Sequence, residues 1–238
     1  MFNFLERKIN KIIDDIYDKE ELEKEKENAK KLEQVLDLAK KIMKEEGRNL
    51  VPIKVYVNSI GEIVRQRYIF KLYCGEKVTM AADLFDDLGF RLKKYFSEDM
   101  SKEDKEQEYE ISLDKHLIIP AAWNRDRFVS NVTDIGRDCN NPFSYDIINH
   151  MSYIFLPVGI TILYNGNHSV LTGVLKKEGK IKTNHSFDLR NKYNQIRFDG
   201  TYYREIETNE ILHKVKNFEL GVIFEIGRIL AENNIKLF

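Results

Sequence analysis

Residues 153–175 read YIFLPVGITILYNGNHSVLTGVL, and this stretch decides the expected fold. Its two apolar runs, 153–156 and 159–164, indicate strands, because turn-forming residues bound each of them. The polar turn 165–169 follows at once, and the apolar spacing of 170–175 indicates a short helix. A strand that passes through a glycine turn into a helix predicts an α+β fold, with a mixed sheet and flanking helices.

The domain that contains this stretch is expected to cover residues 111–238. A short apolar strand at 117–119 precedes the stretch and stops at Pro120, a residue that cannot donate to a sheet ladder. Periodic apolar residues predict the remaining elements. They are a helix at 127–136, an extended region from 181, a hairpin formed by 201–206 and 211–215, and a final helix at 218–232.

Residues 1–47 precede this domain as a charged segment whose first glycine is Gly47, which predicts a long helix. Asp18 and Glu21 have the spacing of a capping box, so we expect a break in the helix there. Residues 18–31 hold six acidic and five basic side chains, a balance typical of a solvated helix. The alternative is a helix that binds a protein partner or dimerises as a coiled coil.

Residues 48–96 are expected to form a hairpin followed by a helix. Valine and isoleucine alternate with other residues over 51–57, which is strand spacing, and 58–61 has turn chemistry. A helix is then expected at 80–96. Residues 97–110 hold seven acidic residues and two lysines, so this segment is expected to be an acidic linker.

The composition excludes several classes of protein. The 38 basic and 39 acidic residues give a formal charge of −1, which argues against an overall basic nucleic-acid binder. No apolar run approaches the roughly 20 residues that cross a membrane. The two cysteines, Cys74 and Cys139, lie far apart in the sequence, and no secretory signal is visible at the start. A reduced cytoplasmic protein is therefore expected.

The polar turn after the second strand is the first candidate site. Backbone N–H groups at a helix start have no partner within the helix, and the helix dipole favours an anion there. His168 adds a side chain that titrates near neutral pH, so it is the candidate general acid or base. The alternative is a turn whose polar residues only cap the helix. The candidate phosphate-binding residues here are Asn165, Gly166, Asn167 and Ser169.

The second candidate site is the segment 120–128. Arg125 and Arg127 are expected to point to the same side of an extended stretch, and arginine binds phosphate as a two-pronged donor. Trp123, the only tryptophan, is a candidate platform for stacking a base, and Asp126 is a second candidate catalytic residue. The alternative is a surface ion pair with the tryptophan in the core.

Taken together, the two segments resemble the ParB/sulfiredoxin-like superfamily, in which an Asn-x-Arg or Pro-x-Arg loop and a later polar turn before a helix hold nucleotide phosphates. Within 117–176, Asn124, Arg125 and Arg127 match the first motif and residues 166–169 match the second. Ser169 stands where members of the superfamily usually carry an arginine. The resemblance implies a ParB/sulfiredoxin-like core and a nucleotide ligand such as ATP with Mg²⁺. The chain is also similar to uncharacterised bacterial proteins found near mobile elements and phage-defence genes.

A third candidate is a basic stretch at 176–197, where seven basic residues face two acidic ones and aromatic residues interleave. Charge neutralisation and stacking are how single-stranded nucleic acid is held. The alternative is a solvated loop. The candidate nucleic-acid-binding residues are Lys176, Lys177, Lys180, Lys182 and Arg190.

The expected function is therefore binding of a nucleotide or a nucleic-acid end, with phosphoryl transfer or phosphodiester hydrolysis as the implied reaction. No metal-ligand pattern is visible in the five scattered histidines, so the metal stays unknown. The alternative is a non-enzymatic module, in which the N-terminal helices bind a protein and the basic stretch touches nucleic acid.

Overall fold

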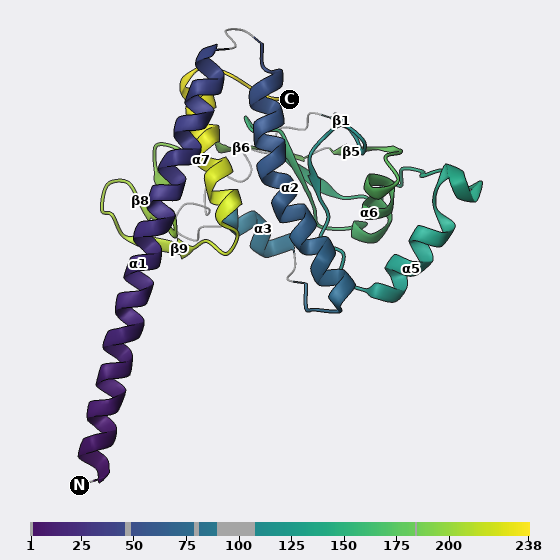
Figure 1. Ribbon diagram of the computed structural model, residues 1–238. Coiled ribbons are helices and arrows are strands. Elements are labelled where there is room, and N and C mark those ends of the chain that lie inside the picture. Colours follow the sequence, from purple (N-terminus) through teal and green to yellow (C-terminus); the bar gives the residue numbers. More distant parts are fainter. Residues whose placement is uncertain (1, 46–48, 79–80, 90–107, 184) are drawn as a thin grey trace.

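The computed structural model describes residues 2–45, 49–78, 81–89, 108–183 and 185–238, and its architecture is α+β, as expected (Figure 1). Helices pack beside three small sheets. The helices are α1 Phe2–Glu45, α2 Val51–Cys74, α3 Ala81–Asp87, α5 Arg125–Asp134, α6 Asn167–Leu175 and α7 Phe218–Glu232, with short 3-10 turns η2 Arg137–Cys139 and η3 Leu189–Asn191.

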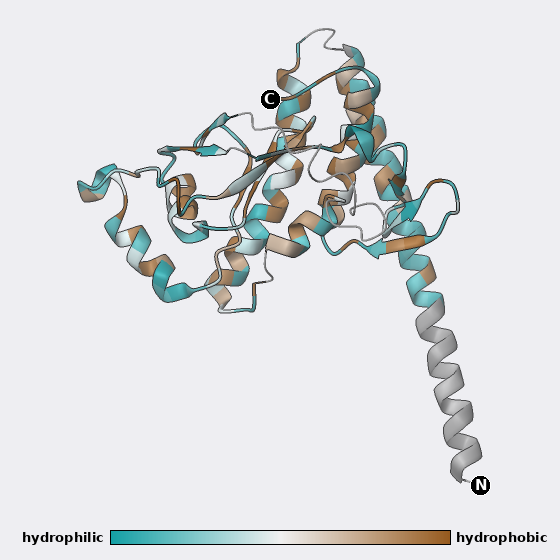
Figure 2. Ribbon diagram, turned by 180° about the vertical axis from the view of Figure 1, so that it is seen from behind, coloured by the Kyte–Doolittle hydropathy of each residue, from teal (hydrophilic) through white to brown (hydrophobic). Residues whose placement is uncertain are grey.

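The largest sheet has four strands and is mixed. Its order is β2-β4-β3-β6, with β2 parallel to β4, β4 antiparallel to β3, and β3 parallel to β6. Its strands are β2 Ile118–Ile119, β3 Ser152–Leu156, β4 Ile160–Leu163 and β6 His185–Asp188. Most of their residues are hydrophobic (Figure 2), and most are buried, because both faces of the sheet are covered.

Two further sheets flank this one, and both are antiparallel. The first pairs β1 Tyr109–Ser112 with β5 Lys180–Thr183. The second has the order β7-β8-β9, formed by Ile196–Phe198, Tyr202–Glu205 and Ile211–Lys214. The expected hairpin at 201–215 and the expected final helix at 218–232 are confirmed.

α7 lies between α1 and α2 and contacts both helices (Figure 1). Nine residues of α7 are buried, and one continuous hydrophobic core runs from Leu32 of α1 to Leu237 near the C-terminus. The helices of the N-terminal half therefore share their core with the C-terminal half. Among the described residues, no helix is both long and apolar enough to cross a membrane.

The hairpin expected from residue 50 onward is wrong, because residues 51–74 form the single helix α2. Val51 and Val55 are exposed, whereas Ile53 and Val57, one helical turn apart, are buried. The buried residues then recur every three or four positions to the end of the helix. Gly61, expected in a turn, allows the helix to lie directly against Leu117, since a Cβ there would be 2.1 Å from a Leu117 methyl carbon.

One further expectation is wrong, and two others are described only in part. α1 runs from Phe2 to Glu45 without the break expected near Asp18. The helix expected at 80–96 is described only as α3, and residues 90–96 lie outside the described residues. Residues 97–107 of the expected acidic linker also lie outside the described residues. The last two residues of that linker, 109 and 110, belong to β1.

Candidate functional site

A pocket of about 380 Å³ lies where β4 passes into α6, and we call it the α6 pocket. The loop after β2 and the first turns of α5 close its other side. It brings together seven of the residues predicted from the two sequence motifs. The pocket is lined by Trp123, Arg127, Asn131, Asn149, Tyr164, Asn165, Gly166, Asn167, His168 and Ser169.

Gly166 makes the turn into α6 with a positive φ of 74°. A Cβ at this position would lie 2.6 Å from a His150 ring carbon and 2.8 Å from the Asn149 carbonyl oxygen, so only glycine fits. The turn sets the helix to begin at Asn167. The N–H groups of Asn167, His168 and Ser169 then have no acceptor within the helix. The positive end of α6 therefore faces the pocket.

Arg127 reaches the α6 pocket, but Arg125 does not. Asn124 caps α5 by accepting the Arg127 N–H at 2.9 Å, so the helix begins at Arg125. The expectation of an extended stretch with both arginines on one side is wrong, because residues two apart on a helix lie roughly 200° apart. Arg125 extends to Gly75 at the end of α2, and neither it nor Asp126 lines the pocket.

The Arg127 guanidinium carbon lies 5.7 Å from the centre of the Trp123 ring, in a cation–π contact. Trp123 itself is 58% exposed. An exposed tryptophan at the rim of a pocket that also contains the Arg127 guanidinium is available to stack on a ligand. Trp123 and Arg127, which the sequence predicted for one site, therefore line the same pocket.

His168 holds the loop after β2 against α6. Its Nε2 accepts the backbone N–H of Asn124 at 2.9 Å and that of Trp123 at 3.2 Å, while Asn167 Oδ1 accepts the Ala121 N–H at 2.7 Å. An accepting Nε2 assigns the proton of the neutral ring to Nδ1. Burial lowers the pKa of His168, and the charge of Arg127 lowers it further, so the ring is neutral at pH 7.

His150 is a buried residue of this site that the sequence did not reveal. Its Nδ1 accepts the Asp146 N–H at 3.0 Å, so the proton of the neutral ring lies on Nε2. Nε2 then donates to Ser169 Oγ at 2.8 Å, and Ser169 Oγ donates to the Gly166 carbonyl at 3.1 Å. Burial lowers the pKa of His150. Ser169 is thus a link in a structural chain and is not an activated nucleophile, because its histidine partner is a donor.

Three more lining residues were missed: Asn131, Asn149 and Tyr164. Asn131 lies one helical turn after Arg127, so the helix expected at 127–136 already placed both on one face, and this spacing was the signal for Asn131. Tyr164 ends β4 immediately before the predicted turn. Asn149 lies next to His150 in an irregular loop, and no sequence pattern there signals its position.

Four of the five candidate residues in the predicted basic stretch 176–197 form ion pairs. Lys176 pairs with Asp138 at 2.8 Å, and Arg190 pairs with Asp188. On β5, Lys180 pairs with Glu110 of β1 and Lys182 pairs with Glu108 just before β1, at 2.6 Å each. The pairing of β1 with β5 brings acidic residues to this surface that are far away in the sequence. Nucleic-acid binding here stays a prediction.

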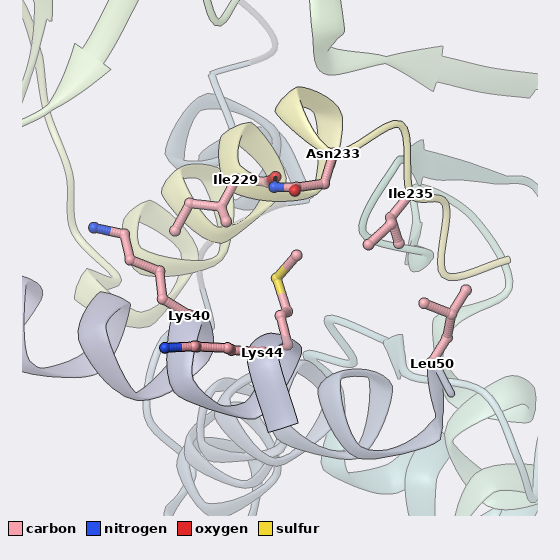
Figure 3. Close-up of a pocket in the computed structure, with 7 residues that line it drawn as sticks. Lys40, Lys44, Leu50, Ile229, Asn233 and Ile235 are labelled. Carbon is pink, nitrogen blue, oxygen red and sulfur yellow. Dashed lines mark hydrogen bonds between the residues drawn. The ribbon is translucent and has the colours of Figure 1, made fainter. Parts of the chain in front are cut away.

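A second pocket, of about 510 Å³, lies between the end of α1 and the end of α7. Figure 3 shows Lys40 and Lys44 along one side and Leu50 and Ile235 on the opposite side, with both ammonium groups directed away from those two residues. Its described lining combines four apolar side chains and two lysines with the amide of Asn233. The pocket lacks the convergent polar groups of the α6 pocket.

No group of three or more potential metal-ligating side chains forms within the part of the chain that the structure describes. No curated protein and no solved structure matches the chain. A family model matches residues 17–237, nearly the whole chain. The chain therefore belongs to DUF6710, a family of unknown function.

Proposed function

We propose that this protein binds a phosphate-bearing ligand, a nucleotide or a nucleic-acid end, in the α6 pocket. The observation that carries the proposal is the convergence of Arg127, the N-terminal N–H groups of α6 and Trp123 on one pocket. The volume of about 380 Å³ is within the range of small-molecule sites. Arg127 and the N–H groups of α6 complement a phosphate, and Trp123 complements a base.

The phosphate is expected at the start of α6, where the helix dipole and the N–H groups favour an anion. Arg127 supplies charge-assisted hydrogen bonds to phosphate oxygens. The side-chain amides that line the pocket offer neutral donors and acceptors to the sugar and the base. Trp123 provides a face for stacking.

The hydrogen bonds favour a binding protein over an enzyme. His168 uses Nε2 to hold the Asn124 and Trp123 amides, and Ser169 is tied to His150 and Gly166. A general base at His168 Nε2 would first have to give up these bonds. Phosphoryl transfer and phosphodiester hydrolysis, implied by the ParB/sulfiredoxin resemblance, are the less supported reading of this pocket.

Two arginines on α5 allow a matched test of the proposed site. Replacement of Arg127 by Ala should weaken nucleotide binding by about 10- to 100-fold, since a hydrogen bond to a charged group contributes about 1.5–3 kcal/mol. Arg125→Ala, two residues earlier and outside the pocket, should leave binding unchanged. The measurement is a thermal-shift titration with nucleotides and with phosphorylated oligonucleotides. Equal loss in both variants would contradict the site.

A further inference from the structure

We propose that the α6 pocket takes a ligand with a single phosphate group and binds it without a divalent cation. The ligand class is a nucleoside monophosphate unit, either free or as the phosphorylated end of an oligonucleotide. The inference rests on the proposed function and narrows it. It also departs from the Mg²⁺–triphosphate that the ParB/sulfiredoxin resemblance implies.

The charge of the pocket matches one phosphate. Among the described residues that line it, Arg127 is the one cationic side chain, since burial favours the neutral form of His168. The start of α6 adds the equivalent of roughly half a charge. Together they come to about +1.5, against the charge of roughly −1.5 to −2 that one phosphate monoester carries near neutral pH. The second and third phosphates of a triphosphate would find no further cation among the lining residues that the structure describes.

The donor set does not suit Mg²⁺. Magnesium in nucleotide sites is usually held by one or two carboxylates together with the phosphates. No aspartate or glutamate is among the described residues that line the α6 pocket. Asp126 lies outside the lining, and Asp146 Oδ1 accepts the N–H groups of Ile148 and Asn149 in its own loop. Two lining residues carry hydroxyls, Ser169 and Tyr164. Ser169 Oγ already accepts a hydrogen bond from His150 Nε2 and donates one to the Gly166 carbonyl.

The rest of the pocket suits a nucleoside rather than more phosphate. Four side-chain amides line it, and Asn167 Oδ1 is held by the Ala121 N–H, which leaves the NH₂ end of Asn167 as the end available to a ligand. Neutral amides complement sugar hydroxyls and base edges, whereas polyphosphate is bound by cations and metal ions. The four amides belong to Asn131, Asn149, Asn165 and Asn167.

The test is a calorimetric titration of the full chain with adenosine, inorganic phosphate, AMP, ADP and ATP, each with Mg²⁺ and with EDTA. We expect AMP to bind at least about tenfold more tightly than ATP, a difference of about 1.4 kcal/mol, and its affinity to be the same in EDTA. An affinity for ATP equal to or above that for AMP, or a requirement for Mg²⁺, would overturn the inference. The absence of binding by every phosphorylated ligand would overturn the proposed function itself.

Two further arms sharpen the result. Asn131→Lys places a second cation one helical turn after Arg127, and it should improve ADP relative to AMP by about tenfold if charge sets the selection. If the ratio of the ADP and AMP affinities is the same in this variant as in the unaltered protein, the charge of the pocket does not select for a single phosphate. A 5′-phosphorylated trinucleotide, compared with its 5′-hydroxyl form, separates a nucleic-acid end from a free nucleotide as the source of the phosphate.

Discussion

At the scale of single residues, His168 acts in the structure as an acceptor for two backbone amides. Replacement of His168 by Ala leaves both N–H groups without this acceptor in a largely buried place, so the free energy of unfolding should fall by about 1–3 kcal/mol. Denaturant unfolding checks this value. Asn131→Ala, in the same pocket, is the control and should change it by no more than about 0.5 kcal/mol. An unchanged stability of the His168 variant would show that these bonds contribute nothing.

The same residue illustrates what the sequence could and could not reveal about the site. The motif Asn165–Ser169 was found because a strand, a glycine turn and a helix follow one another along the chain. The hydrogen bonds of His168 and the place of His150 depend on contacts between segments that are distant in sequence. Arg125 was assigned to the site because the start of α5 was expected two residues later than Asn124 sets it.

At the scale of elements, α2 shows how one pattern fits two structures. Alternation over 51–57 suits a strand, but a helix also places Ile53 and Val57 on one face. The pattern over the next four turns decides for the helix, because the buried residues keep a spacing of three or four to Leu72. The basic surface of β5 could not be assessed from the sequence either, since its acidic partners are Glu110 of β1 and Glu108 just before that strand.

A pair of substitutions two residues apart separates the helix from the expected hairpin. Val57→Asp puts a carboxylate where the side chain is fully buried, so it should destabilise the protein by more than about 3 kcal/mol. Val55→Asp changes a side chain that is 61% exposed and should cost no more than about 0.5 kcal/mol. In a hairpin both side chains would share one face, and the two variants would behave alike. Chemical denaturation of both proteins distinguishes the two outcomes.

At the scale of the whole molecule, the described helices and sheets share most of their apolar residues in one core. The α+β class and the C-terminal elements followed from local apolar spacing and turn residues. The sharing of this core between α1, α2 and the C-terminal half could not be predicted, because packing of α7 between two helices has no signature in any one segment. The ParB/sulfiredoxin-like core stays a hypothesis, since no solved structure matches the chain.

Three histidines spread over this fold make its stability depend on pH. Burial lowers the pKa of His116, His150 and His168, so the folded protein holds fewer protons than the unfolded chain at mildly acidic pH. The free energy of unfolding should therefore fall as the pH drops below about 6.5, the ordinary histidine value, and level off below the lowered values of the folded state. Carboxyl groups titrate near 4, so the interval from pH 7.5 to 5.5 reports mainly on histidines.

Urea unfolding at pH 7.5, 6.5 and 5.5 measures this effect directly. The decrease should be smaller in a His150→Asn variant, which removes one of the three histidines with a lowered pKa, than in the unaltered protein. A phosphate ligand in the α6 pocket changes the expectation for His168, because its charge offsets that of Arg127 and raises the pKa of the ring. Saturating ligand should therefore reduce the loss of stability at pH 5.5. A free energy of unfolding that is constant across this interval would contradict the lowered pKa values of the three rings.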